Sequence, residues 1–335
     1  EPDGKTGFAH LFEHLMFQGT ENREGEYFSP FMDAGATGMN GTTSEDRTNY
    51  FATVPTGALD MALWMESDRM SYLLGAVTQE ALDEQRGVVK NEKRQRENRP
   101  YAQMADRIRD GLYPVDHPYR HSIIGSMEDL DNASLEDVHG WFSTYYGASN
   151  VVLVLAGDIT VETAKEKVSH YFGEAPAGVP LVYPKKWVPN LAENRKESMY
   201  DRVGQTRITR VWALPGLNDR DTTLMYLVNE SLVGNKNSPL QKTLVDDLQL
   251  ATSVGGSAYG RVLSGEYTLT IDLKPGVSYD EVMPIVDRII AEYLDGGPDK
   301  QIVENAKLGV NMYMISALER TSAIGRVLAE GYLYS

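Results

Sequence analysis

Two histidines and a glutamate near the start of the chain have the spacing of a catalytic metal site. His10 and His14 lie four residues apart, so on a helix both imidazoles share one face and can bind one metal ion. Glu13 lies between them, close enough to reach a water molecule on that metal. Neutral imidazoles suit zinc, and a nearby carboxylate can take the proton from zinc-bound water. The alternative is a surface helix whose two histidines happen to lie four residues apart.

A catalytic zinc site usually has a third protein ligand and one open position. The sequence predicts a helix over 78–98 that begins at Thr78 as its N-cap. Leu82 and the pair Val88–Val89 form its apolar stripe, and Glu92 follows the valines by three or four residues, so it faces inward. A buried carboxylate needs a partner, which is either the metal or an arginine.

These groups and their surroundings resemble peptidase family M16, the inverzincins that include insulin-degrading enzyme, pitrilysin and the mitochondrial processing peptidase. Glu92 follows the second histidine by 78 residues, as in that family. The resemblance runs along essentially the whole chain. Besides the motif it is carried by residues 7–9, 17–20, 40–43, 48–51, 117–119, 125, 145–146, 150–154 and 157–158.

The resemblance implies one zinc ion in the first half of the chain. The implied ligands and general base are His10, His14, Glu92 and Glu13. Family members usually carry a supporting glutamate seven residues before the third ligand, where this chain has Gln85, with Glu84 beside it. An amide can still orient a ligand by hydrogen bonding, but it contributes no charge.

The resemblance also implies a peptide substrate that binds in extended form. Such a peptide would add a strand to an exposed edge near residues 36–43, where main-chain groups bind without demanding a particular sequence. The expected contact residues are Asn40, Gly41 and Thr42. For Asn40 the alternative is a turn residue with left-handed geometry.

One catalytic element of the family is absent at its matching positions. Active members carry an arginine, followed seven residues later by a tyrosine, in a second domain. The matching positions here are Val245 and Thr252, and neither can donate a charged hydrogen bond to an oxyanion. The resemblance therefore implies that this pair comes from a second M16-like subunit or from a second half of a longer chain.

The second half of the chain repeats the pattern of the first without the metal ligands. Residues 50–57 resemble residues 269–276, each a strand and a glycine before two helices. Pairing Gly19 with Gly234 makes Met225, Val228 and Asn229 the counterparts of His10, Glu13 and His14. Pairing Gly57 with Gly276 makes Asn311 the counterpart of Glu92. The alternative is that any two α+β domains look alike at this level of detail.

We therefore expect an α+β fold with two duplicated LuxS/MPP-like metallohydrolase domains, each an antiparallel-rich sheet with helices packed on one face. Residues 1–175 would form the catalytic-type zinc domain without its N-terminal strand. Residues 176–198, which hold four prolines, would be the linker. Residues 199–335 would form a degenerate second domain, truncated at its C-terminus.

Hydrophobic periodicity places the expected elements. Helices are expected near 6–18, 57–73, 78–98, 101–112, 134–146, 160–172, 221–233, 239–249, 278–294 and 299–335. Strands are expected near 36–43, 47–54, 150–157, 199–203, 206–214, 251–259 and 265–274.

Composition narrows the function further. The chain has 335 residues, a net charge of −16 and no cysteine, which excludes disulfides and thiolate metal sites. The acidic balance argues against nucleic-acid binding, and no apolar run reaches the roughly 18 residues of a membrane span. A bacterial periplasmic or secreted location is implied by the resemblance alone.

The other histidines carry little weight. His117 and His121 are separated by a proline, and His139 and His170 are isolated on predicted helices.

The leading hypothesis is a zinc endopeptidase or oligopeptidase that acts on extended or unfolded peptides. The alternatives are a non-catalytic M16-like assembly or partner subunit, against which the intact ligand set speaks, and a LuxS-type lyase, which uses a cysteine that this chain lacks.

Overall fold

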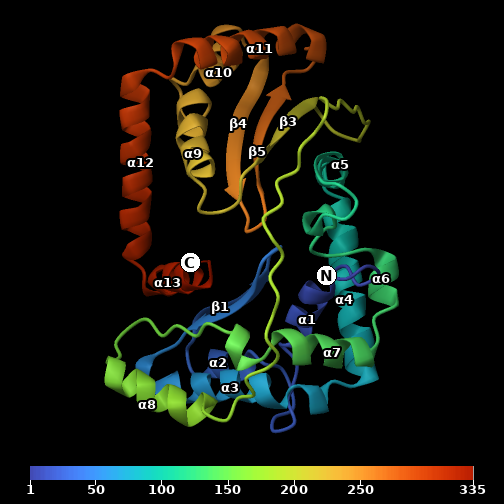
Figure 1. Cartoon of the computed structure of the whole chain (residues 1–335), viewed down its shortest axis with the longest axis vertical. Helices are drawn as coiled ribbons and strands as arrows, with labels where there is room; N and C mark the ends of the chain where they lie inside the picture. Colours follow the sequence, from blue (N-terminus) through green and yellow to red (C-terminus); the bar gives the residue numbers. More distant parts are fainter. Residues whose placement is uncertain (335) are drawn as a thin grey trace. The chain divides into compact units, whose positions relative to one another are not determined.

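The computed structural model describes residues 1–334, which divide into two compact units of mixed helix and strand (Figure 1). The first unit contains residues 1–99 and 121–183 together with the described residues from 319 onward; the second contains residues 100–120 and 184–318. The predicted α+β class is confirmed. Each unit is discontinuous in sequence: the first takes in a helix from the end of the chain, and the second takes in residues 100–120. The domains expected from the sequence are continuous ranges.

The first unit is built around a two-stranded antiparallel hairpin of β1 (Thr37–Thr43) and β2 (Thr48–Thr53). The amide N–H of Ser44 donates to the carbonyl of Arg47 across the turn (2.8 Å), and Thr43 lies opposite Thr48. The helices of this unit are α1 (Phe8–Leu15), α2 (Ser29–Asp33), η1 (Thr56–Ala58), α3 (Leu59–Tyr72), η2 (Leu74–Ala76), α4 (Gln79–Glu97), α6 (Met127–Asp131), α7 (Leu135–Tyr145), η4 (Ala148–Asn150), α8 (Val161–Phe172) and α13 (Thr321–Leu333).

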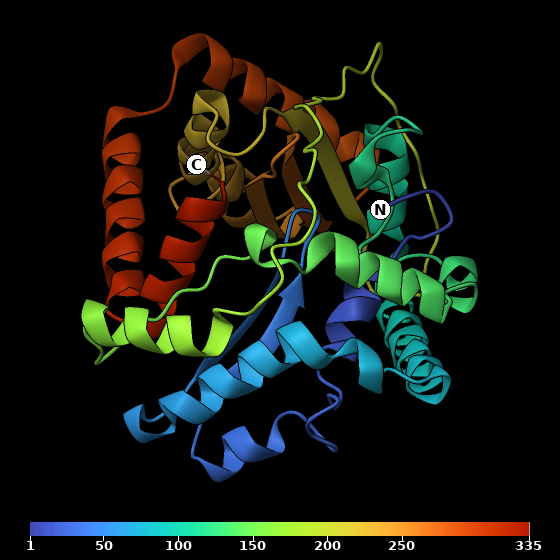
Figure 2. The same ribbon diagram turned by 60° about the horizontal axis from the view of Figure 1, so that its bottom comes forward.

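Helices α1 and α4 share the core of the first unit. Figure 2 shows α1, in dark blue, lying against α4, in teal. Leu11 and Phe12 of α1 and Leu82 and Val89 of α4 are completely buried in one apolar cluster. Burying these side chains fixes the rotation of both helices, which decides where their polar residues point.

The second unit holds a three-stranded antiparallel sheet in the order β3-β5-β4, formed by β3 (Arg207–Leu214), β4 (Ala251–Gly260) and β5 (Gly265–Leu273). Alternate residues of β3 face two different apolar clusters: Ile208 packs with helices α9 and α11, whereas Val211 packs with Leu112 at the end of α5. The helices here are α5 (Gln103–Leu112), η3 (Pro118–Arg120), α9 (Arg220–Leu232), α10 (Pro239–Gln241), η5 (Lys242–Asp247), α11 (Tyr279–Gly296) and α12 (Lys300–Leu318).

Two predicted strands, 150–157 and 199–203, are not strands in the structure. A strand requires a hydrogen-bonding neighbour, and within residues 1–334 no backbone bond joins residues 152–156 to another segment. In the 199–203 segment Tyr200 is fully exposed, so no buried face favours a strand there. The pattern of β-branched residues therefore predicted two strands that the structure does not contain.

Two predicted helices are interrupted. The segment 239–249 forms one turn of α10 and then the π-helical turn η5, and it ends where Gln249 adopts a left-handed backbone with φ 55°. The segment 299–335 forms α12 and α13, because the backbone of Arg320 is extended (φ −108°, ψ 129°). Neither break coincides with a proline or glycine, the signals on which the sequence prediction relied.

Candidate metal centre

The first unit brings three potential metal ligands together. Helix α1 supplies His10 and His14 on one face, and α4 supplies Glu92. The Nε2 atoms of both histidines lie 3.6 Å from Oε2 of Glu92. Within residues 1–334 this is the only group of three or more His, Cys, Asp or Glu side chains that could hold a metal ion, and its ligand atoms all lie within 4.8 Å of one another.

The donor atoms fit a zinc ion. With zinc–ligand bonds of about 2.0 to 2.1 Å, two ligand atoms of a tetrahedral site lie roughly 3.3 Å apart, close to the spacing observed. Burial, followed by the charge of His14, lowers the pKa of His10 to about 4, so at neutral pH His10 presents an unprotonated imidazole. A metal can therefore bind there without displacing a proton from His10.

Glu13 lies beside the donors as a buried carboxylate. Its exposed fraction is 7%. Burial raises the pKa of Glu13, and a hydrogen bond from the Thr43 hydroxyl to its Oε2 opposes that shift. A Cβ atom at Gly41 would lie 2.8 Å from Oε1 of Glu13, so the carboxylate fits because position 41 is glycine. A raised carboxylate pKa suits a general base that must later release its proton.

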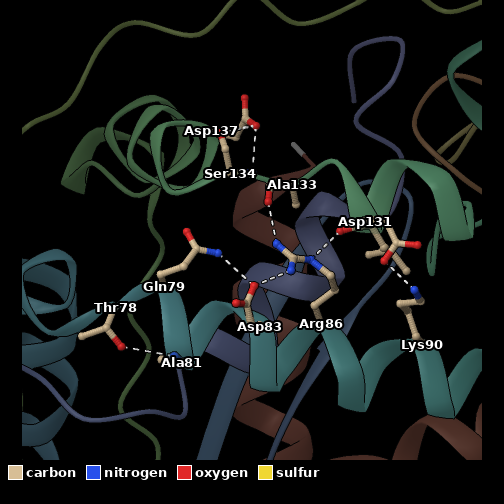
Figure 3. Close-up of polar contacts among 11 residues, drawn as sticks. Thr78, Gln79, Ala81, Asp83, Arg86, Lys90, Asp131, Ala133, Ser134 and Asp137 are labelled. Carbon is tan, nitrogen blue, oxygen red and sulfur yellow. Dashed lines mark hydrogen bonds and ion pairs between the residues drawn. The ribbon is translucent and has the colours of Figure 1, made fainter.

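Polar contacts anchor helix α4, which carries Glu92, to the segment before α7 (Figure 3). The Thr78 hydroxyl caps the first turn of the helix by accepting from the Ala81 amide. The Arg86 guanidinium donates to the carbonyls of Leu130 (2.8 Å) and Ala133 (2.7 Å). These carbonyls lie at the end of α6 and just beyond it, so Arg86 satisfies acceptors that the helix leaves open.

The predicted third ligand is half-buried and has a second partner. Oε1 of Glu92 is paired with Arg96, one turn further along α4, while Oε2 faces the histidines. The arginine that the sequence offers as the alternative partner of Glu92 is therefore also present, although Arg96 is exposed.

The two predicted supporting residues make no contact with the imidazoles among the described hydrogen bonds. Gln85 is buried, and Glu84 is exposed. Their predicted supporting roles stay predictions.

The three expected substrate-contact residues lie on β1 with alternating exposure. Asn40 and Thr42 are exposed, whereas Gly41 is buried against Glu13 and Phe17. The Gly41 amide donates to its neighbour's side-chain oxygen, Asn40 Oδ1 (2.9 Å). Asn40 thus occupies a main-chain donor that a bound peptide could use instead.

Among residues 1–334 the remaining histidines, His121 beside Glu1 included, belong to no second group of three potential metal ligands. His117 is buried in the second unit, with Nε2 at 2.8 Å from the Trp187 carbonyl and Nδ1 accepting from the Tyr119 amide. His139 and His170 are exposed. Both nitrogens of His117 are therefore satisfied without a metal.

The second unit carries no comparable donor set at the matching positions. The counterparts of the ligands and base lie on α9 and α12 as Met225, Val228, Asn229 and Asn311. Val245 packs against the apolar core, and the Thr252 hydroxyl donates to the Asp272 carbonyl (3.2 Å). Neither residue presents the charged donor that the missing arginine would supply.

Sequence reasoning missed the hydroxyl groups that surround Glu13. The sequence places Thr43 on the expected peptide-binding edge, and Thr48, Tyr50 and Tyr146 contribute only to the family resemblance. The signal was available in the two-residue period of β1, because Gly41 and Thr43 must share the face opposite to Asn40 and Thr42.

Two histidines and two glutamates on paired helices, beside an antiparallel hairpin, form a candidate metal site. The chain belongs to peptidase family M16. The profile described as Peptidase M16 inactive domain matches residues 132–310, and the profile described as Insulinase (Peptidase family M16) matches residues 1–117. The Insulinase match contains all four site residues.

Curated relatives of similar sequence are named zinc proteases. The zinc protease PqqE of Helicobacter pylori is 25% identical over 98% of this chain and 74% of its own length. An uncharacterized zinc protease of Mycobacterium leprae is 23% identical over 95% of this chain and 71% of its own length.

Solved structures support the fold. A protease from Helicobacter pylori superposes with a TM-score of 0.87 at 24% identity, over 100% of this chain and 81% of its own. A peptidase M16 inactive domain from Pseudomonas fluorescens gives 0.85 at 18% identity, over 99% and 79%. The first half of the periplasmic protease PqqL from Escherichia coli gives 0.73 at 16% identity, over 100% and 74%. Among the described residues, no helix has both the length and the apolar character needed to cross a bilayer.

Proposed function

We propose that this chain is a zinc-dependent endopeptidase or oligopeptidase that cleaves extended or unfolded peptides. The observation that carries the proposal is the convergence of His10, His14 and Glu92 within 4.8 Å, with the buried carboxylate of Glu13 beside them. Its relatives named zinc proteases support the same reading.

Different residues would bind the metal and transfer the proton. His10, His14 and Glu92 would hold one zinc ion, which supplies Lewis acidity that polarises a carbonyl and acidifies a water molecule. Glu13 takes the proton of the attacking water and gives it to the leaving amine nitrogen. Its burial keeps competing water away from that proton.

The substrate would bind along β1. Asn40 and Thr42 are exposed there, and the Gly41 amide donates to the Asn40 side chain. A peptide carbonyl that displaces Asn40 Oδ1 would gain this donor and lie on the strand that contacts Glu13. Recognition through main-chain groups suits substrates of varied sequence.

The chain would work with a partner that supplies an arginine and a tyrosine. Val245 and Thr252 occupy the positions where the resemblance places that pair. A structural neighbour described as the first half of a periplasmic protease suggests a second M16-like half or subunit as the source, and a periplasmic location.

A non-catalytic assembly subunit is the alternative function. The profile named as inactive matches residues 132–310, which exclude all four site residues. The matched range covers most of the second unit together with residues 132–183 of the first, and it leaves the four site residues in the part that matches the Insulinase profile.

Glu13→Gln tests the proposal directly. The amide cannot take a proton from water, so turnover of an unfolded peptide should fall by about 10²- to 10⁴-fold while zinc content stays unchanged. The measurement is peptide cleavage and bound zinc for both proteins, with the candidate partner present. Equal, chelator-insensitive cleavage by wild type and variant would defeat the peptidase assignment, and no cleavage by either would favour the assembly subunit.

A further inference from the structure

A hydroxyl group holds the proposed general base from the side of β1. The Thr43 hydroxyl donates to Oε2 of Glu13, and the carboxylate's other oxygen packs against the bare Cα of Gly41. Because alternate residues of a strand share a face, Gly41 and Thr43 meet the carboxylate together. Sequence distance hides this contact, since Glu13 and Thr43 are 30 residues apart.

Thr43 is the first member of a chain of hydroxyl groups. Its Oγ1 lies 3.1 Å from Oγ1 of Thr48, the residue opposite it on β2. Thr48 in turn hydrogen-bonds to the phenol of Tyr146, just beyond α7. The Tyr146 hydroxyl lies 2.8 Å from the hydroxyl of Tyr50, which is also on β2.

The carboxylate dictates the direction of the bonds nearest to it. An ionised carboxylate only accepts, and each hydroxyl has one proton to donate. Thr43 must therefore give its proton to Glu13, so Thr48 must donate to Thr43. Two aligned O–H dipoles then point at one carboxylate, and bonds aligned in this way strengthen one another. At the other end of the chain Tyr50 donates to Tyr146, and the hydrogen bond between Tyr146 and Thr48 joins the two pairs.

The series of hydroxyl groups ends at Tyr50, beside a buried arginine. The guanidinium of Arg69 lies 4.2 Å from the centroid of the Tyr50 ring, and Arg69 is 1% exposed and paired with Glu66. Burial raises the pKa of both phenols, so neither releases a proton near neutral pH. Holding the carboxylate in place is the role that this arrangement supports.

We propose that Thr43, backed by Thr48, Tyr146 and Tyr50, is a positioning residue that fixes the Glu13 carboxylate for proton transfer. This inference rests on the proposed function, because it assigns a role in the same reaction. It concerns the rate of the chemical step rather than metal binding, since none of the four hydroxyls is among the metal donors.

The test compares Thr43→Val with Thr43→Ser. Valine keeps the shape of threonine and removes the donor, so kcat for a peptide should fall about tenfold, the loss expected for one hydrogen bond to a charged group. KM, zinc affinity measured by chelator competition and the thermal midpoint should stay near the wild-type values. Serine restores the hydroxyl and should recover at least half of the lost kcat.

A second variant and a control keep the test decisive. Tyr146→Phe removes one hydroxyl deeper in the chain, so kcat should fall two- to threefold even if Thr43→Val proves unstable. Tyr171→Phe removes a phenol that contacts Asp60 on the unit's surface and should change nothing. Full kcat in both Thr43→Val and Tyr146→Phe, with wild-type cleavage still dependent on Glu13, would overturn the positioning role alone. Absence of Glu13-dependent cleavage in wild type would instead overturn the proposed function.

Discussion

The chemistry of the first unit depends on how each polar atom of a few side chains is occupied. The Nε2 atoms of His10 and His14 both lie 3.6 Å from Oε2 of Glu92, an arrangement that a cation would stabilise. Oε2 of Glu13 accepts a hydrogen bond from the Thr43 hydroxyl. Oε1 lies where a side chain at position 41 would collide with it, and Gly41 has none. Small changes at these neighbours should therefore affect turnover before they affect folding.

Gly41→Ala is the sharpest single change of this kind. The added Cβ would lie 2.8 Å from Glu13 Oε1 and 2.9 Å from Cζ of Phe17, so the carboxylate must move. We expect kcat to fall at least tenfold, with about 1 to 3 kcal/mol lost from the free energy of unfolding and zinc retained. The measurements are peptide turnover, a denaturant melt and metal content.

Gly57→Ala is the matched control. A Cβ at Gly57 would have no heavy atom within 4 Å, so turnover and stability should match the wild type. Equal turnover in Gly41→Ala and wild type would contradict the tight fit between β1 and the carboxylate.

Helices α1 and α4 place the ligands because their apolar faces are buried against each other. The sequence predicted both helices correctly, since apolar periodicity and the Thr78 cap are local signals, and the ligand set stays a prediction. It could not predict the partner of Arg86 or the hydroxyls around Glu13, because these contacts join segments 30 to 47 residues apart. The strand prediction for 150–157 was wrong for the same reason, because strand formation depends on a neighbouring strand that the local sequence does not identify.

Arg86→Ala tests the anchoring of α4. The change leaves the Ala133 carbonyl without its Arg86 donor and removes one of the donors of the Leu130 carbonyl, so the free energy of unfolding should fall by about 1 to 3 kcal/mol. Because Glu92 lies on the same helix, zinc affinity should weaken several-fold as well. Unfolding midpoints and chelator competition measure the two effects. Arg94→Ala, an exposed change on α4, is the control, and an equal response in both variants would contradict the anchoring role.

The chain combines two units of related sequence pattern, and the potential metal ligands lie in the first. Each unit includes a segment from the other half of the sequence, residues 100–120 in the second and the described residues from 319 onward in the first. The donors lie in the first unit, while the second holds Asn229 and Asn311 among its matching positions. A duplicated fold with one set of ligands predicts one metal ion per chain.

Zinc stoichiometry tests the central claim most directly. Wild-type protein loaded with zinc and dialysed should hold one zinc per chain, and Glu92→Gln should hold almost none, because it replaces the ligand contributed by α4. Glu80→Gln, an exposed change on the same helix, should keep the full equivalent. One tightly bound zinc in Glu92→Gln, or none in the wild type, would contradict the account.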